Sequence, residues 1–73
     1  MAWPKDKTRI KTNLNAVELD EVIKAVDENR VSWIPEETSV FAESCGGTFT
    51  FLGSRFHIEE WSEEVISLNV TER

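Results

Sequence analysis

The residue types best suited to metal binding and nucleophilic catalysis are scarce in this chain of 73 residues, because His57 is the single histidine and Cys45 the single cysteine. Zinc needs three or four nitrogen and sulfur ligands, so we predict no metal and no cofactor. In the strand register predicted below, His57 lies on an outer sheet face in line with Thr50 and Glu43. That register places no nucleophile or orienting carboxylate beside it, and nothing near Cys45 would activate its thiol. We therefore predict that the protein is not an enzyme.

Carboxylates are the most abundant charged groups, with 14 acidic against 8 basic side chains and a net charge of −6. Paired carboxylates could perform acid–base catalysis, but so short a chain leaves little room for a substrate cleft. Spaced carboxylates could also imitate the phosphates of DNA and occupy the basic groove of a DNA-binding protein. The candidates for such mimicry are Glu36, Glu37, Glu43, Glu59, Glu60, Glu63 and Glu64. The simpler interpretation of EEWSEE is a solvated acidic loop, and we expect no direct binding of nucleic acid.

The start of the chain has the opposite charge. Its four basic residues alternate along the sequence and would share one face of an extended segment; they are Lys5, Lys7, Arg9 and Lys11. We predict that residues 1–8 form a flexible basic arm that lies along an acidic groove of a partner or adds to the edge of a partner's sheet, with Trp3 as its apolar anchor. A frayed terminus without function is the alternative.

Residues 40–58, VFAESCGGTFTFLGSRFHI, predict three antiparallel strands joined by turns at Gly46-Gly47 and Gly53-Ser54. The cross-strand pairs in this register include Phe51 with Phe56 and Phe49 with Ile58. One face is then apolar and carries Val40, Ala42, Phe49, Phe51, Phe56 and Ile58. Phe41 and Leu52 lie on the opposite face, either beneath a tryptophan or as an exposed contact patch.

Residues 15–30 predict an amphipathic helix with Asn15 as its N-cap. Its apolar stripe, with the spacing of one helix face, consists of Leu19, Val22, Ile23 and Val26. This stripe would cover the apolar face of the sheet. Residues 9–12 predict a short strand, and residues 65–71 alternate as a fourth strand would, although a helix also fits them.

These elements predict a single α+β domain over residues 1–73, in which a three- to four-stranded antiparallel meander, with its double hairpin at 38–58, packs one amphipathic helix on its apolar face. No apolar run approaches the roughly 20 residues that a membrane helix needs. The start, MAWPKDKTRIK, lacks the apolar region of a signal peptide. We expect a cytoplasmic protein that is a monomer and has no membrane partner.

Size, charge layout and the lack of enzymatic motifs are typical of the small acidic proteins that lytic phages make to redirect host machinery. Within that class the chain resembles the RNA polymerase-binding transcription regulators of lytic Xanthomonas phages, in length, size and α+β character rather than in a motif. The resemblance implies contact with the β′ subunit of the host polymerase near its N-terminus, inhibition of promoter-specific initiation through loss of σ, and antitermination. The partner-binding residues that we predict from the sequence itself are Trp3, Lys5, Lys7, Arg9, Lys11, Phe41 and Leu52.

Overall fold

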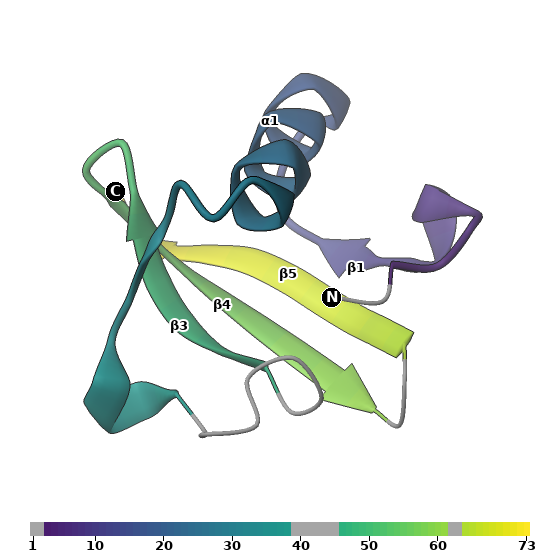
Figure 1. The fold of residues 1–73 in the computed structure, drawn as a ribbon. Helices are drawn as coiled ribbons and strands as arrows, with labels where there is room; N and C mark the ends of the chain where they lie inside the picture. The colour runs from purple at the N-terminus through teal and green to yellow at the C-terminus, as the bar shows by residue number, and fades with distance from the viewer. Residues whose placement is uncertain (1–2, 39–45, 62–63) are drawn as a thin grey trace.

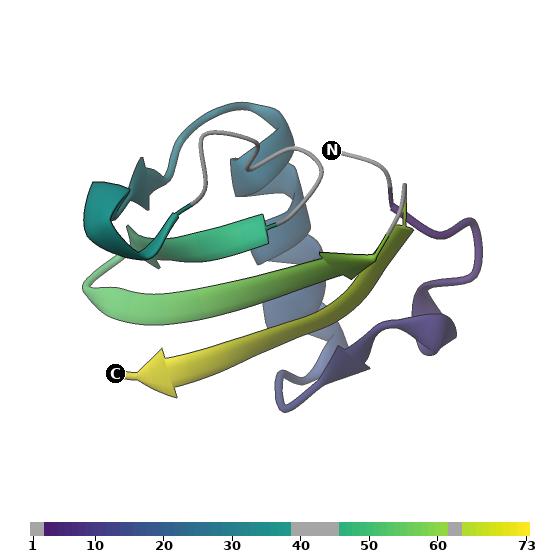
Figure 2. The same cartoon turned by 90° about the horizontal axis from the view of Figure 1, so that it is seen from below.

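The computed structural model describes residues 3–38, 46–61 and 64–73. Its helix is α1 (Ala16–Asp27), and its strands are β1 (Lys11–Thr12), β2 (Ser32–Trp33), β3 (Gly46–Phe51), β4 (Ser54–Trp61) and β5 (Glu64–Glu72). The strands form one five-stranded sheet in the order β1-β5-β4-β3-β2, and α1 lies across one face of it (Figures 1 and 2). The α+β class is therefore confirmed.

The predicted three- to four-stranded antiparallel meander is only partly right. Strands β3, β4 and β5 follow one another and pair antiparallel. However, β2 adds antiparallel to β3 at one edge, and β1 adds parallel to β5 at the other. A parallel pair between residues so far apart in sequence needs a crossover through the rest of the fold, which local patterns do not reveal.

Helix α1 forms largely where its capping and apolar spacing predict. Asn15 Oδ1 accepts the backbone N–H of Glu18 at 2.8 Å, which satisfies one donor of the first turn. Just after the helix, Asn29 adopts a φ of +55°, a left-handed conformation that asparagine tolerates at helix ends. The apolar stripe packs on the sheet, with Leu19, Val22 and Ile23 buried and Val26 partly buried.

The β3–β4 hairpin turns at Leu52 and Gly53, so the predicted turn at Gly53-Ser54 is wrong by one residue. Leu52 has a φ of +50° and Gly53 a φ of +80°. Two consecutive central residues with positive φ define a type I′ turn, whose twist matches that of the flanking strands. Leu52 is therefore a turn residue, not part of a strand row opposite the helix.

Moving the turn changes the strand register but not the faces. Phe49 pairs with Phe56, and Gly47 pairs with Ile58, two residues away from the predicted pairs. Because side chains alternate with a period of two, a shift of two residues leaves each one on its predicted face. Phe49, Phe56 and Ile58 are accordingly fully buried beneath α1, whereas Phe51 is only partly buried.

The prediction of a turn at Gly46-Gly47 is wrong, because both glycines belong to β3 and pair with β4. The need for glycine at Gly47 is steric, since a Cβ there would lie 2.6 Å from Cγ2 of Thr38. The remainder of the predicted first strand, with Phe41 and Cys45, lies outside the described residues.

The prediction of a fourth strand over residues 65–71 is confirmed by β5. The short strand predicted over residues 9–12 is right only for Lys11–Thr12, which form β1, because Arg9 belongs to a 3₁₀ helix. The prediction of an acidic loop at EEWSEE is wrong, since β4 continues to Trp61 and β5 begins at Glu64. Glu60 follows Ile58 with the two-residue alternation of a strand and lies inside the molecule, only 7% exposed.

Side chains extend the hydrogen-bond ladders at both edges of the sheet. At the β1 edge, Asn13 Oδ1 accepts the N–H of Val70, and Asn13 Nδ2 donates to the carbonyl of Val70, both at 2.9 Å. At the β2 edge, the Thr38 hydroxyl accepts the N–H of Thr48 at 3.2 Å and donates to its carbonyl at 3.1 Å. Both side chains thus bond their neighbours as a further strand residue would.

Candidate functional site

The N-terminal segment, defined here as residues 3–10, is folded against the body of the molecule. Trp3 packs against the hydrophobic core, and its Nε1 donates to Asp27 Oδ1 at 2.7 Å. Pro4 is buried. The side chain that we predicted to anchor a partner therefore contacts the chain's own helix.

The prediction of an extended basic segment is wrong, because residues Lys7–Arg9 form a 3₁₀ helix. Asp6 starts it by accepting the backbone N–H of Thr8 at 3.0 Å and its hydroxyl at 2.6 Å. These hydrogen bonds to the ionised carboxylate lower the pKa of Asp6. A local side-chain cap therefore overrides the alternation of charges from which we predicted an extended segment.

The predicted cations of the N-terminal region do not form one free patch. Lys7 Nζ lies 3.2 Å from Asp20 Oδ1 on α1, and Arg9 Nη1 lies 3.6 Å from Glu64 Oε1 of β5. Lys5 and Lys11 are exposed and form no ion pair with another described residue. Half of the four predicted cations are thus engaged by carboxylates of the body.

The hairpin tip, defined as residues Phe51–Gly53, lies at the opposite end of the sheet from the N-terminal segment (Figures 1 and 2). Leu52 is 83% exposed, the most exposed of the large hydrophobic side chains in the described part of the chain. The predicted binding residues are therefore split between two ends of the molecule.

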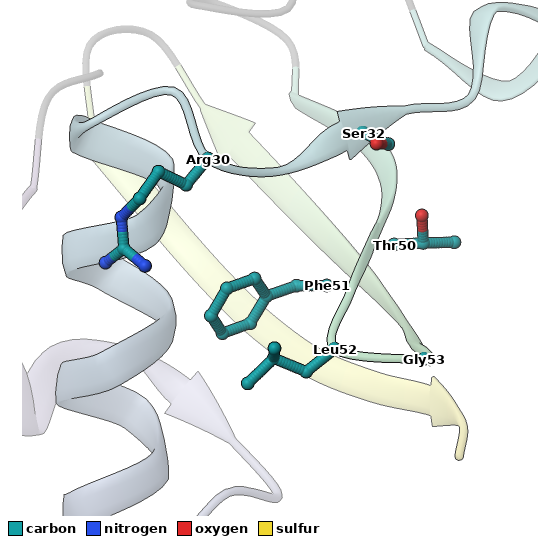
Figure 3. Close-up of a pocket in the computed structure, with 6 residues that line it drawn as sticks. All are labelled: Arg30, Ser32, Thr50, Phe51, Leu52 and Gly53. Atoms are coloured by element: carbon teal, nitrogen blue, oxygen red, sulfur yellow. The ribbon is translucent and has the colours of Figure 1, made fainter.

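A hollow of about 610 Å³ opens beside this tip, lined by Arg30, Ser32, Thr50, Phe51, Leu52 and Gly53. Figure 3 shows that the side chains of Arg30, Phe51 and Leu52 extend into the space between α1 and the hairpin. The Arg30 guanidinium carbon lies 5.9 Å from the centre of the Phe51 ring. Cationic, aromatic and aliphatic groups thus converge at one place.

Sequence reasoning did not single out Arg30 as a binding residue, although it stands just beyond the C-terminal end of α1. The chain leaves α1 through the left-handed Asn29 and runs towards β2, which brings Arg30 above the end of β3. An arginine just after a helix and an aromatic residue at the end of a strand are a signal only once the two elements are known to pack together.

Three polar side chains lie near one another on the sheet face opposite α1, those of Thr48, His57 and Glu59. Thr48 Oγ1 lies 3.1 Å from His57 Nδ1, and His57 Nε2 lies 3.7 Å from Glu59 Oε1. The predicted register put Thr50 and Glu43 in line with His57 and no nucleophile or orienting carboxylate beside it, whereas the structure places the Thr48 hydroxyl and the Glu59 carboxylate there. However, Thr48 is only 5% exposed, so its hydroxyl is shielded from a reactant, and the arrangement is better suited to joining strands β3 and β4.

Three of the carboxylates considered for DNA mimicry are buried or paired with a cation in the described part of the chain. Glu60 is buried. Glu64 pairs with Arg9, and Glu37 Oε2 lies 3.9 Å from Arg55 Nη1. Glu43 and Glu63 lie outside the described residues. A row of free carboxylates in the spacing of phosphates is therefore not supported.

No family model, curated protein or solved structure matches this chain. Within residues 3–38, 46–61 and 64–73, no three histidine, cysteine or acidic side chains are grouped so as to hold a metal ion. Over the same residues, no helix has the length and apolar character required to cross a membrane.

Proposed function

We propose that this protein is a non-enzymatic regulator that acts by binding a partner protein, and that the partner is bacterial RNA polymerase. The observation that supports protein binding is Leu52, which is both exposed to water and held in a left-handed backbone conformation. Neither property stabilises the folded chain.

The backbone conformation of Leu52 carries a local cost. A left-handed conformation costs an L-residue other than glycine roughly 1–2 kcal/mol, and asparagine relieves part of it by local hydrogen bonding. Type I′ turns accordingly favour Asn-Gly over Leu-Gly. A residue that is unfavourable for the turn and exposes apolar surface points to a role outside folding.

The polymerase is the partner implied by the resemblance to phage transcription regulators. In this proposal the protein acts in the bacterial cytoplasm, contacts the β′ subunit, inhibits initiation and promotes antitermination. The support is the combination of small size, net charge of −6 and an exposed leucine at a hairpin tip.

The test measures binding of the purified protein to purified bacterial RNA polymerase, with Leu52→Asn as the central variant. An asparagine before Gly53 suits a type I′ turn, so we expect the free energy of unfolding to rise by about 0.5–1 kcal/mol. The variant also loses the apolar contact that Leu52 would bury in the complex. This loss should weaken binding by about tenfold or more, which is roughly 1.4 kcal/mol.

Val17→Thr is the matched control, because Val17 is also exposed, at 71%, but lies on α1. It should leave binding within about twofold. If Leu52→Asn binds as tightly as the unmodified protein, Leu52 is not the contact. If the unmodified protein does not bind the polymerase at all, the polymerase is not the partner.

A further inference from the structure

We propose that the hollow between α1 and the hairpin tip binds a segment of the partner protein that carries one carboxylate next to an apolar side chain. Arg30 would bind the carboxylate, and Phe51 and Leu52 would pack on the apolar group. This inference rests on the proposed function, because it names the chemistry of the partner surface that the protein recognises.

Arg30 has hydrogen-bonding capacity to spare. Its Nε and Nη2 both donate to a single oxygen, Glu28 Oε1, at 3.2 and 3.0 Å. A guanidinium carries five N–H donors in a planar fork, so the edge formed by Nη1 and Nη2 can still receive a second carboxylate. The contact with Glu28 is half exposed on both sides, and such pairs contribute little and are easily exchanged.

Phe51 contributes an aromatic face next to the Arg30 guanidinium. The ring lies beneath it at 5.9 Å from the centroid and is itself packed against the hydrophobic core. At this distance the face of the ring attracts the guanidinium, and the planar fork of donors suits bidentate recognition of a carboxylate. The apolar neighbour of that carboxylate would then meet Phe51 and the exposed Leu52.

The surrounding charges limit the segment to one carboxylate. A neighbouring hollow shares Phe51 and Leu52 and also contains Glu18, Glu21 and Arg73. Arg73 is already bound by both oxygens of Glu18, at 2.9 Å each. Since Glu21 would repel a second acidic group, an apolar segment with a single acid fits this end of the molecule better than a run of acids.

The experiment titrates the full nitrogen-15-labelled protein with a capped synthetic heptapeptide and follows its backbone amides by two-dimensional NMR. The peptide has glutamate and phenylalanine at its centre and serine and glycine elsewhere. The matched peptide has glutamine in place of glutamate, which retains size and removes the charge. We expect the glutamate peptide to shift the amides of Arg30, Phe51, Leu52 and Gly53, and the glutamine peptide to bind about tenfold more weakly.

Two variants distinguish recognition by Arg30 from general charge attraction. Arg30→Gln should weaken binding of the glutamate peptide by about tenfold. Lys24→Gln removes the same charge from an exposed position on α1 that does not line the hollow, and it should leave binding unchanged. Arg30→Lys retains the charge but loses the planar fork, so it should bind with intermediate strength.

Equal binding of the two peptides, an absence of shifts at the hairpin tip, or equal effects of Arg30→Gln and Lys24→Gln would overturn the inference. Because both peptides are tested on the unmodified protein, the result does not depend on the folding of a variant. Peptide binding without polymerase binding would refute the proposed partner alone, whereas polymerase binding without peptide binding would refute this inference alone.

Discussion

The N-terminal segment and the hairpin tip lie at opposite ends of one sheet and differ in how their side chains are used. In the N-terminal segment, Trp3, Lys7 and Arg9 are each engaged by a carboxylate of the body. At the hairpin tip, Leu52 extends into water beside Arg30. The comparison teaches that a basic segment in an otherwise acidic chain can bind the chain's own carboxylates as readily as those of a partner.

The largest expected effect is on the free energy of unfolding, and it tests whether the hairpin tip is separate from the hydrophobic core. Phe49 is fully buried, stacked on Phe56 at 5.4 Å and edge-on to Trp33 at 5.2 Å. Phe49→Ala should lower the free energy of unfolding by about 3–5 kcal/mol, which is severe for so small a domain. Phe51→Ala, at a partly buried position, should cost only about 1–2 kcal/mol.

Denaturant unfolding followed by tryptophan fluorescence measures both values. The two variants remove the same atoms from one strand, so each is the control for the other. If Phe51→Ala proves as costly as Phe49→Ala, the hairpin tip belongs to the core, and the contrast between the two ends disappears.

The faces of the strands could be predicted from sequence, whereas the register could not. A period of two placed Phe49, Phe56 and Ile58 correctly even though the turn was misassigned. The misassignment arose because a leucine in a left-handed conformation is disfavoured on local grounds, so Gly53-Ser54 looked the better turn. The local rule failed at Leu52, the residue that carries the proposed function.

The candidate site was less predictable than the fold, because long-range contacts determine it. Asp6 and Thr8 could have indicated a capped turn, but no local pattern pairs Lys7 with Asp20 or Arg9 with Glu64. The hollow of Arg30 and Phe51 likewise depends on how α1 and β3 pack. Among the predicted contact residues that the structure describes, Leu52 is the one with an exposed apolar side chain.

An intermediate effect on the free energy of unfolding is expected from the hydrogen bonds that attach the N-terminal part of the chain to β5. Asn13 follows β1 directly and makes three hydrogen bonds to β5, two through its amide group to Val70 and one from its backbone to Asn69. Asn13→Ala removes the two side-chain bonds and should lower the free energy of unfolding by about 1–2 kcal/mol. Hydrogen exchange should show the loss as faster exchange of the Val70 amide.

Asn13→Asp is the matched variant for this test. Its carboxylate still accepts from the Val70 amide but cannot donate to the Val70 carbonyl. Its stability should therefore lie between those of the unmodified protein and Asn13→Ala. If Asn13→Ala left stability and amide exchange unchanged, β1 and the N-terminal segment would be held by their other contacts. The hydrogen bonds of Asn13 would then not account for the attachment of this end of the molecule.

The smallest expected effect is an acid dependence that compares one carboxylate from each end. Hydrogen bonds from Arg73 lower the pKa of Glu18 from its ordinary value of 4.5, and those from Thr8 lower the pKa of Asp6 from 3.8. A carboxylate whose pKa is lower in the folded chain contributes stability above its ordinary pKa, and this contribution is lost as the pH falls through the folded value. Glu18→Gln should therefore flatten the fall in stability that begins below about pH 4.5, and Asp6→Asn the fall below about pH 3.8.

Thermal unfolding between neutral and acidic pH measures both slopes, with the unmodified protein as reference. Both groups are exposed, so each change should be small. If either variant loses stability with acid as steeply as the unmodified protein, the corresponding hydrogen bonds do not persist in solution, and that end of the sheet is less ordered than its contacts indicate.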